Sequence, residues 1–283
     1  MQSEYYIISQ KDDTAMEITE EQFRELKRAR KRLSSSYAIT HKFRLVASNF
    51  KMVEEAMDAL GQLYITQSAP EKLETAKPHL NACVNNLVLS ARIFTSQLKR
   101  HVQGCLPQDR EVVETLTQKM EREYRRSFAY RFIDSLYDYV SNYGISIHSL
   151  KTESRIEKDE SGEPRRVYSF DAFIEKDYIG GPAEFRVSVF DEVPRRINLL
   201  SVLSEFFACL NRLHDYAMMV LESTVLQANA TIQEFINVFT SEHGTDHINL
   251  FVEHTTQSFN NRIYDKFPIS MYVHNHNMPQ EYV

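Results

Sequence analysis

The chain has 283 residues, of which 42% are hydrophobic and 25% are charged, a composition typical of a globular protein. Seven glycines and eight prolines are too few for a low-complexity chain, so the sequence is expected to fold throughout. The formal net charge of -6 argues against a global attraction to nucleic acid, which leaves local basic patches as the only candidate contacts.

Three long helices are expected in the first part of the chain. The segment TEEQFRELKRARKRL begins at Thr19 with a Thr-x-x-Gln capping pair, which predicts the start of a first helix. Apolar residues between positions 43 and 64 recur at spacings of three and four and predict a second helix. Pro70 is suited to open a third, which continues until Gly104. Two long helices with a short connection are expected to pack antiparallel.

The pattern changes after a fourth expected helix. Apolar residues between positions 112 and 139 share one helical stripe, and Gly144 can end that helix. Residues 146–176 alternate polar and apolar side chains around the turn-like DESGEP, which predicts a β-hairpin. The segment AEFRVSVF, residues 183–190, is expected to add a third strand. Helical spacing returns after Pro194.

These elements predict a mainly α fold, in which a bundle of long helices carries a small insertion of a β-hairpin or three strands. Residues 1–145 would form the amino-terminal bundle and residues 146–193 the β-rich insertion. Residues 194–240 would complete the bundle as a final helix, and residues 241–283 would form a tail of ambiguous structure.

The cysteines and the hydropathy pattern bear on location. Cys83, Cys105 and Cys209 are far apart and form no Cys-x-x-Cys pair, which indicates reduced thiols and argues against a disulfide framework. No stretch approaches the roughly 18 apolar residues of a membrane span. A cytoplasmic protein without a membrane association is therefore expected.

One segment carries a specific motif. The stretch SFAYRFIDSLYDYVSNYGISIH, residues 127–148, resembles a motif near SFxYRFxxxLRNYxxHxGxPxH of the HEPN (higher eukaryote and prokaryote nucleotide-binding) family. The matching residues are Ser127, Phe128, Tyr130, Arg131, Phe132, Leu136, Tyr139, Gly144 and His148. The resemblance implies a helical bundle, a homodimer, and an RNase or a related component of bacterial defence or toxin–antitoxin systems.

The catalytic positions of that motif are altered. In HEPN RNases an arginine holds the scissile phosphate and a histidine one to two turns later moves a proton. Here Tyr137 stands at the arginine position, Asp138 follows it, and Asn142 stands at the histidine position. Tyrosine lacks a permanent charge and asparagine cannot exchange protons near neutral pH. We therefore expect a catalytically silent protein that binds RNA or a protein partner.

Other candidate site residues are weaker. Arg125, Arg126 and Arg131 lie near the motif and are the candidates for contacts with RNA phosphates. If the chain is instead a metal-independent RNase, Arg131 and His148 are the alternative catalytic pair.

The remaining patterns favour no further site. The basic cluster of residues 24–32 is typical of a solvated helix face. His243 and His247 are four residues apart and could bind a metal, although Gly244 interrupts their spacing and loop histidines are the simpler interpretation. No phosphate-binding glycine loop or nucleophile elbow occurs, so no cofactor is expected.

Overall fold

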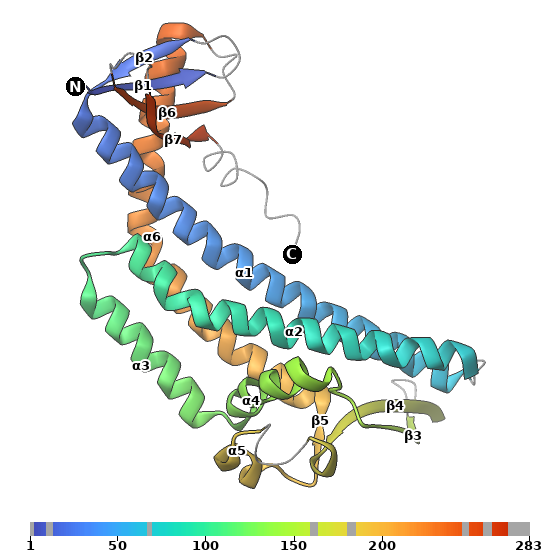
Figure 1. Ribbon diagram of the computed structural model, residues 1–283. Coiled ribbons are helices and arrows are strands. Elements are labelled where there is room, and N and C mark those ends of the chain that lie inside the picture. Colours follow the sequence, from blue (N-terminus) through green and yellow to red (C-terminus); the bar gives the residue numbers. More distant parts are fainter. Residues whose placement is uncertain are drawn as a thin grey trace. The chain divides into compact units, whose positions relative to one another are not determined.

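The computed structural model describes residues 3–9, 14–66, 70–158, 164–179, 185–244, 249–256 and 262–270. The chain divides into two compact units. Unit 1 comprises Met1–Ala38, Arg100–Val113 and Ala217–Val283, and unit 2 comprises Ile39–Lys99 and Glu114–Tyr216. The predicted mainly α class is confirmed, with six α-helices in the described residues (Figure 1).

The first two expected helices form one element. Helix α1 runs without interruption from Glu20 to Ile65 and spans 46 residues. The predicted capping pair at its start is confirmed, because the Thr19 hydroxyl accepts from the Gln22 amide at 3.2 Å and the Gln22 side chain accepts from the Thr19 amide at 2.8 Å. The polar serines that separate the two apolar stripes are accommodated within the helix, since Ser36 is buried and Ser34 bonds the carbonyl of Lys31.

Unit 2 pairs the second half of α1 with helix α2, Pro70–Cys105, which begins at the predicted proline. The Asn49 amide donates to the Asn86 carbonyl at 3.3 Å and to the Ser90 hydroxyl at 2.9 Å, so the two helices lie side by side in unit 2 (Figure 1). Their other faces supply the core of the unit together with helices α3 (Arg110–Arg126), α4 (Phe128–Tyr143) and α6 (Leu199–His243).

The insertion of unit 2 is a three-stranded antiparallel sheet in the order β3-β4-β5. The predicted hairpin is confirmed as β3, Ser149–Lys158, paired with β4, Pro164–Glu175. The strand predicted for residues 183–190 is wrong, because helix α5 occupies Val187–Glu192 and the third strand is β5, Arg196–Asn198. Val189 is the buried residue of α5, and Phe185 and Val193, on either side of the helix, are buried as well.

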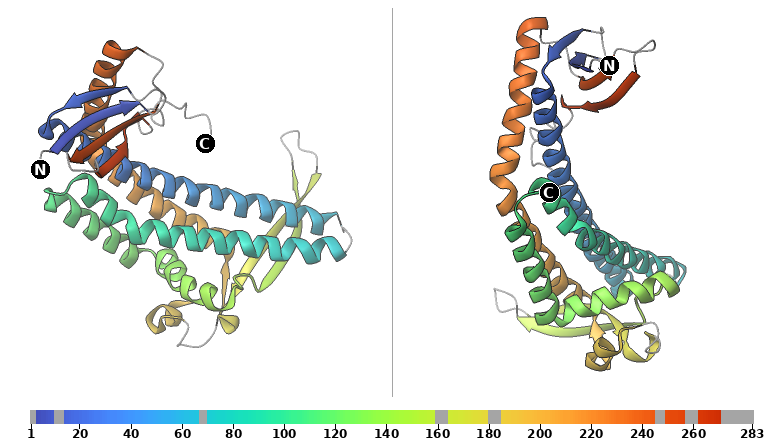
Figure 2. Two further views of the ribbon diagram at one scale, coloured as in Figure 1. Left: turned by 45° about the horizontal axis from the view of Figure 1, so that its top comes forward. Right: turned by 60° about the vertical axis from the view of Figure 1, so that its left-hand side comes forward.

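Unit 1 contains a four-stranded antiparallel sheet that the sequence pattern did not predict. Strands β1 (Ser3–Ser9) and β2 (Ala15–Ile18) come from the start of the chain, and β6 (Leu250–Thr256) and β7 (Arg262–Pro268) come from the tail. The order is β2-β1-β6-β7, and the end of α6 lies along this sheet (Figure 2). None of the helices in the described ranges combines the length and apolar character that a bilayer crossing requires.

Candidate functional site

The junction between α3 and α4 is set by Ser127, the first residue of the motif. The Ser127 hydroxyl accepts from the Tyr130 amide at 3.1 Å, which caps α4, and donates to the Glu205 carboxylate at 2.7 Å. The cap divides the single helix that was expected from Val112 to Tyr139 into α3 and α4. It also ties the start of α4 to α6.

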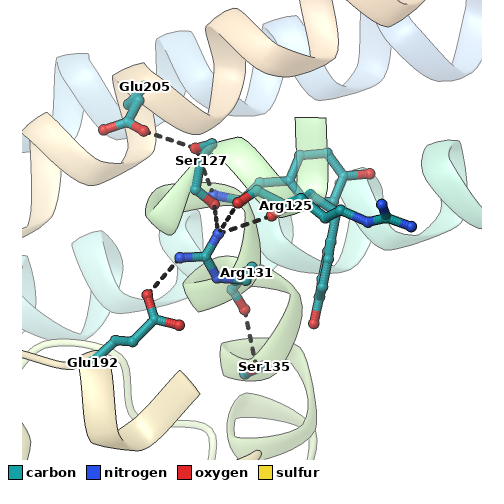
Figure 3. Close-up of polar contacts among 8 residues, drawn as sticks. Arg125, Ser127, Arg131, Ser135, Glu192 and Glu205 are labelled. Carbon is teal, nitrogen blue, oxygen red and sulfur yellow. Dashed lines mark hydrogen bonds and ion pairs between the residues drawn. The ribbon is translucent and has the colours of Figure 1, made fainter. Parts of the chain in front are cut away.

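Arg131 closes the other side of the same junction (Figure 3). Its Nη1 donates to the carbonyl oxygens of Tyr124 at 3.0 Å, Arg125 at 2.7 Å and Ser127 at 3.3 Å, and its Nη2 forms an ion pair with Glu192. Those carbonyls lie at the end of α3, where the helix dipole favours a cation. The side chain is only 17% exposed. The guanidinium thus already donates to groups within the protein and is poorly placed to bind a phosphate.

The altered catalytic positions lie along the exposed side of α4. Tyr137 is half-buried, and the Arg92 guanidinium lies over its ring at 5.3 Å from the centroid. Arg92 also forms an ion pair with Asp134 at 2.5 Å. Asp138 and Asn142 are exposed. The three motif positions therefore present a phenol, a carboxylate and an amide, none of which carries the positive charge that would hold a phosphate.

The alternative catalytic pair is not brought together. Arg131 lies in the first turn of α4, and about 18 Å of helix axis separate it from Tyr143 at the other end. His148 follows that end, where its Nδ1 accepts from the Glu175 amide at 3.1 Å and its ring stacks on Tyr178 at 5.3 Å. Burial lowers the pKa of His148, and the Glu175 carboxylate opposes this shift. His148 is consequently neutral near pH 7 and held in place.

Two hollows flank α3, and basic side chains gather in both. The hollow toward α6 has a volume of about 470 Å³, and the hollow toward α2 and α4 has a volume of about 490 Å³. Seven cationic residues line them: Lys119, Arg122, Arg126 and Arg212 on the α6 side, and Arg92, Lys99 and Arg125 on the α2 side. The four carboxylates in the two linings belong to Glu121, Glu123, Asp134 and Glu205. Positive charge is in excess at this surface, although the chain as a whole is acidic.

The cations of the hollow toward α6 differ in their availability. Arg212 forms a two-pronged ion pair with Glu123, with distances of 3.0 and 2.6 Å, and these hydrogen bonds lower the pKa of Glu123. Lys119 lies over the Tyr216 ring at 4.5 Å from its centroid. Arg122 and Arg126 are exposed and form no ion pair within the described ranges, although the charge of Arg126 helps to lower the pKa of Glu123.

Arg125, the other arginine predicted to contact RNA, is also exposed. It pairs with Glu121 one helical turn earlier, at 3.0 Å. Such an exposed pair holds its guanidinium weakly, so Arg125 can exchange partners at low energetic cost. Of the three predicted phosphate contacts, Arg125 and Arg126 are thus accessible on the last turn of α3, whereas Arg131 is not.

Sequence reasoning missed five members of this surface, which are Arg92, Lys99, Lys119, Arg122 and Arg212. The helical spacing of Lys119, Arg122 and Arg126, at three and four residues, places them on one face of α3 and was the available signal. Arg212 lies on α6 and is brought there only by tertiary packing. No local pattern could have predicted its position.

The weak metal candidate of His243 and His247 lies partly outside the described residues. His243 ends α6 beside Glu242 and Phe239, whereas His247 lies outside the described residues. No group of three or more potential metal ligands occurs among the residues that the structure describes.

Comparisons with known proteins add no assignment. The chain matches no family model, no curated protein and no solved structure. The HEPN-like resemblance therefore rests on the sequence, chiefly on the motif of residues 127–148.

Proposed function

We propose that this chain is a catalytically silent HEPN-like protein that binds RNA through the basic surface on both sides of α3. The observation that carries the proposal is the gathering of seven cationic side chains in the two hollows, with Arg122 and Arg126 exposed and engaged in no ion pair in the described ranges. Cations that have no internal partner can exchange their counterions for phosphates, which is the main source of affinity for a nucleic-acid backbone.

The aromatic residues of the same surface support a single-stranded target. Tyr124 lines the hollow toward α2, where it accepts a hydrogen bond from Arg186 at 2.7 Å, and Tyr137 lies nearby on α4 under Arg92. Both rings are partly exposed. Unpaired bases stack on such rings while arginines hold the phosphates between them. A role in a bacterial defence or toxin–antitoxin system extends this proposal on the resemblance alone.

The test is the salt dependence of binding to labelled single-stranded RNA. Each phosphate contact contributes about 0.7 to the slope of log Kobs against log salt for a single strand. The double variant Arg122→Gln/Arg126→Gln should therefore lower that slope by about 1.4 and weaken binding roughly tenfold at about 0.15 M salt. The matched control is Lys51→Gln/Lys72→Gln, which removes two exposed cations from α1 and α2, outside the hollows.

Equal binding by both double variants would overturn the assignment of this surface. If the natural protein shows no RNA affinity even at low salt, the proposal fails in favour of a protein partner. The α4 residues Asp138, Asn142 and Tyr143 are exposed and could then meet a second copy of the chain or another protein.

The RNase alternative makes a different prediction. A metal-independent RNase would cut RNA in the presence of EDTA, and His148→Ala would abolish cutting. We expect no cleavage, because His148 is held by Glu175 and Tyr178 at the far end of α4 from Arg131. The variant Tyr137→Arg/Asn142→His restores the family's catalytic pair on one helix face. Cleavage by this variant alone would support both the HEPN-like assignment and the silence of the natural chain.

A further inference from the structure

A second concave site lies in unit 2 and shares no residue with the basic surface. It has a volume of about 430 Å³ and lies between the end of α1, the beginning of α2 and the segment that follows α4. Its lining is formed by Leu60, Tyr64, Lys77, Pro78, Leu80, Asn81, Ile145, Ile147, His148 and Leu150. The volume falls within the range of about 300–1,000 Å³ that is usual for small-molecule sites.

One wall of this cavity is fixed by a network of hydrogen bonds. The side-chain amides of Asn81 and Asn85 both donate to the Gly144 carbonyl, at 2.5 and 2.8 Å. The Ser146 amide donates to the Asn81 side chain at 2.7 Å, and the Ser146 hydroxyl reaches the oxygens of both asparagines. Ser146 is completely buried. The loop that carries Ile145 and Ile147 is therefore held in place before any ligand arrives, which lowers the entropic cost of binding.

Asn81 and one nitrogen of His148 have partners within the protein, whereas the Nε2 atom of His148 is buried without a hydrogen-bond partner in the described residues. Asn81 uses both its amide and its oxygen in the network above, and the Nδ1 atom of His148 accepts from the Glu175 amide. Apolar atoms form the larger share of the cavity surface, with Leu60, Leu80 and Ile147 among the aliphatic contributors. Ile145 is 50% exposed and belongs to this lining, so its aliphatic side chain is accessible to a ligand.

Lys77 is the single formally charged group that lines the cavity, apart from the titratable ring of His148. It is exposed, and its Nζ lies 5.9 Å from the centroid of the Tyr64 ring. No carboxylate pairs with it in the described part of the chain. A lone cation at the edge of an aliphatic cavity is complementary to a molecule that has one negative group and an apolar body.

We propose that this cavity binds a small amphipathic carboxylate, such as a medium-chain fatty acid. The hydrocarbon would lie against Leu60, Leu80 and Ile147, and the carboxylate would pair with Lys77. This site is independent of RNA binding, since none of its lining residues belongs to the hollows beside α3.

The test is calorimetric titration of the full-length protein with octanoate and with 1-octanol, its neutral counterpart. An exposed ion pair changes affinity by about two- to fivefold. Lys77→Gln should weaken octanoate binding by that factor and leave octanol binding unchanged. Lys72→Gln, an exposed lysine on the same helix outside the cavity, should change neither.

A second variant tests the cavity itself. Ile145→Trp should fill the space and reduce the affinity for both ligands at least tenfold, whereas Tyr143→Trp, equally exposed but outside the lining, should not. Because the natural chain contains no tryptophan, each new indole reports its own environment by its emission. We expect blue-shifted emission for Ile145→Trp only. Absence of octanoate binding at millimolar concentration, or binding that neither Lys77→Gln nor Ile145→Trp weakens, overturns the proposal.

Discussion

Removal of the Arg131 guanidinium tests whether this residue holds the fold or holds a ligand. In Arg131→Ala, the carbonyls of Tyr124, Arg125 and Ser127 lose their shared donor, and Glu192 loses its cation. A hydrogen bond from a charged donor contributes about 1.5–3 kcal/mol. Because the three carbonyls share one nitrogen, their summed contribution is smaller than that of three separate hydrogen bonds. Solvation of the helix end after the change recovers part of the loss. A net destabilisation of about 3 kcal/mol results.

The assay is thermal unfolding beside the control Arg125→Ala. A loss of about 3 kcal/mol lowers the midpoint by roughly 6–12 °C for a unit of this size. Arg125 and Glu121 are 77% and 57% exposed, so losing their ion pair should cost less than about 0.5 kcal/mol. The structural role of Arg131 is refuted if Arg131→Ala has the same unfolding midpoint as Arg125→Ala but binds RNA far more weakly than the natural protein.

Two further predictions concern the backbone and a buried histidine. Gly144 ends α4 with φ of 69°, a left-handed conformation that alanine adopts less readily than asparagine. Gly144→Ala should therefore lower the free energy of unfolding by about 1 kcal/mol, and Gly144→Asn by less. Equal losses for the two variants in urea unfolding would contradict this prediction. Burial lowers the pKa of His214, although the Asp215 carboxylate opposes this shift, so the folded state favours the neutral ring. The contribution of His214 to the free energy of unfolding is therefore fully present above about pH 6.5 and is lost as the pH falls below that value. His214→Phe keeps the ring stack on Phe43 and should reduce the free energy of unfolding that is lost between about pH 7 and 5.5. Uptake of one proton costs at most about 1.4 kcal/mol per pH unit. If the variant loses as much stability in acid as the natural protein, His214 is not the group responsible.

The helices could be predicted because their signals are local. Helix boundaries are marked by backbone chemistry that needs no distant partner. The Thr19 capping pair and Pro70 mark the starts of α1 and α2, and Gly144 marks the carboxyl end of α4. The start of α4 was missed although its signal was equally local. Ser127 is a good N-cap residue, but the apolar stripe continues across it from α3 into α4.

The sheet of unit 1 could not be predicted in the same way. Strand β1 pairs with β6 from Ser3 opposite Thr256 to Ser9 opposite Leu250, across almost the whole length of the chain. A single strand has little local stability, and what fixes it is a partner that no sequence window contains. The helix α5 shows a related limit, since Phe185, Val187 and Val189 alternate like a strand, yet Val187 is 55% exposed while Phe185 and Val189 are buried.

The residues that match the HEPN motif share one property in this structure: each has a partner inside the protein. Ser127 caps α4, Arg131 closes the end of α3, the Tyr139 hydroxyl donates to the Tyr178 carbonyl at 2.7 Å, and His148 accepts from a backbone amide. Of the three positions that depart from the motif, Asp138 and Asn142 are exposed, whereas Tyr137 is half-buried under the Arg92 guanidinium. A motif made of such residues is informative about how a helix is held, and much less about catalysis. We therefore look for a binding function among exposed cations that form no ion pair in the described residues, such as Arg122 and Arg126 beside α3 and Lys77 at the cavity.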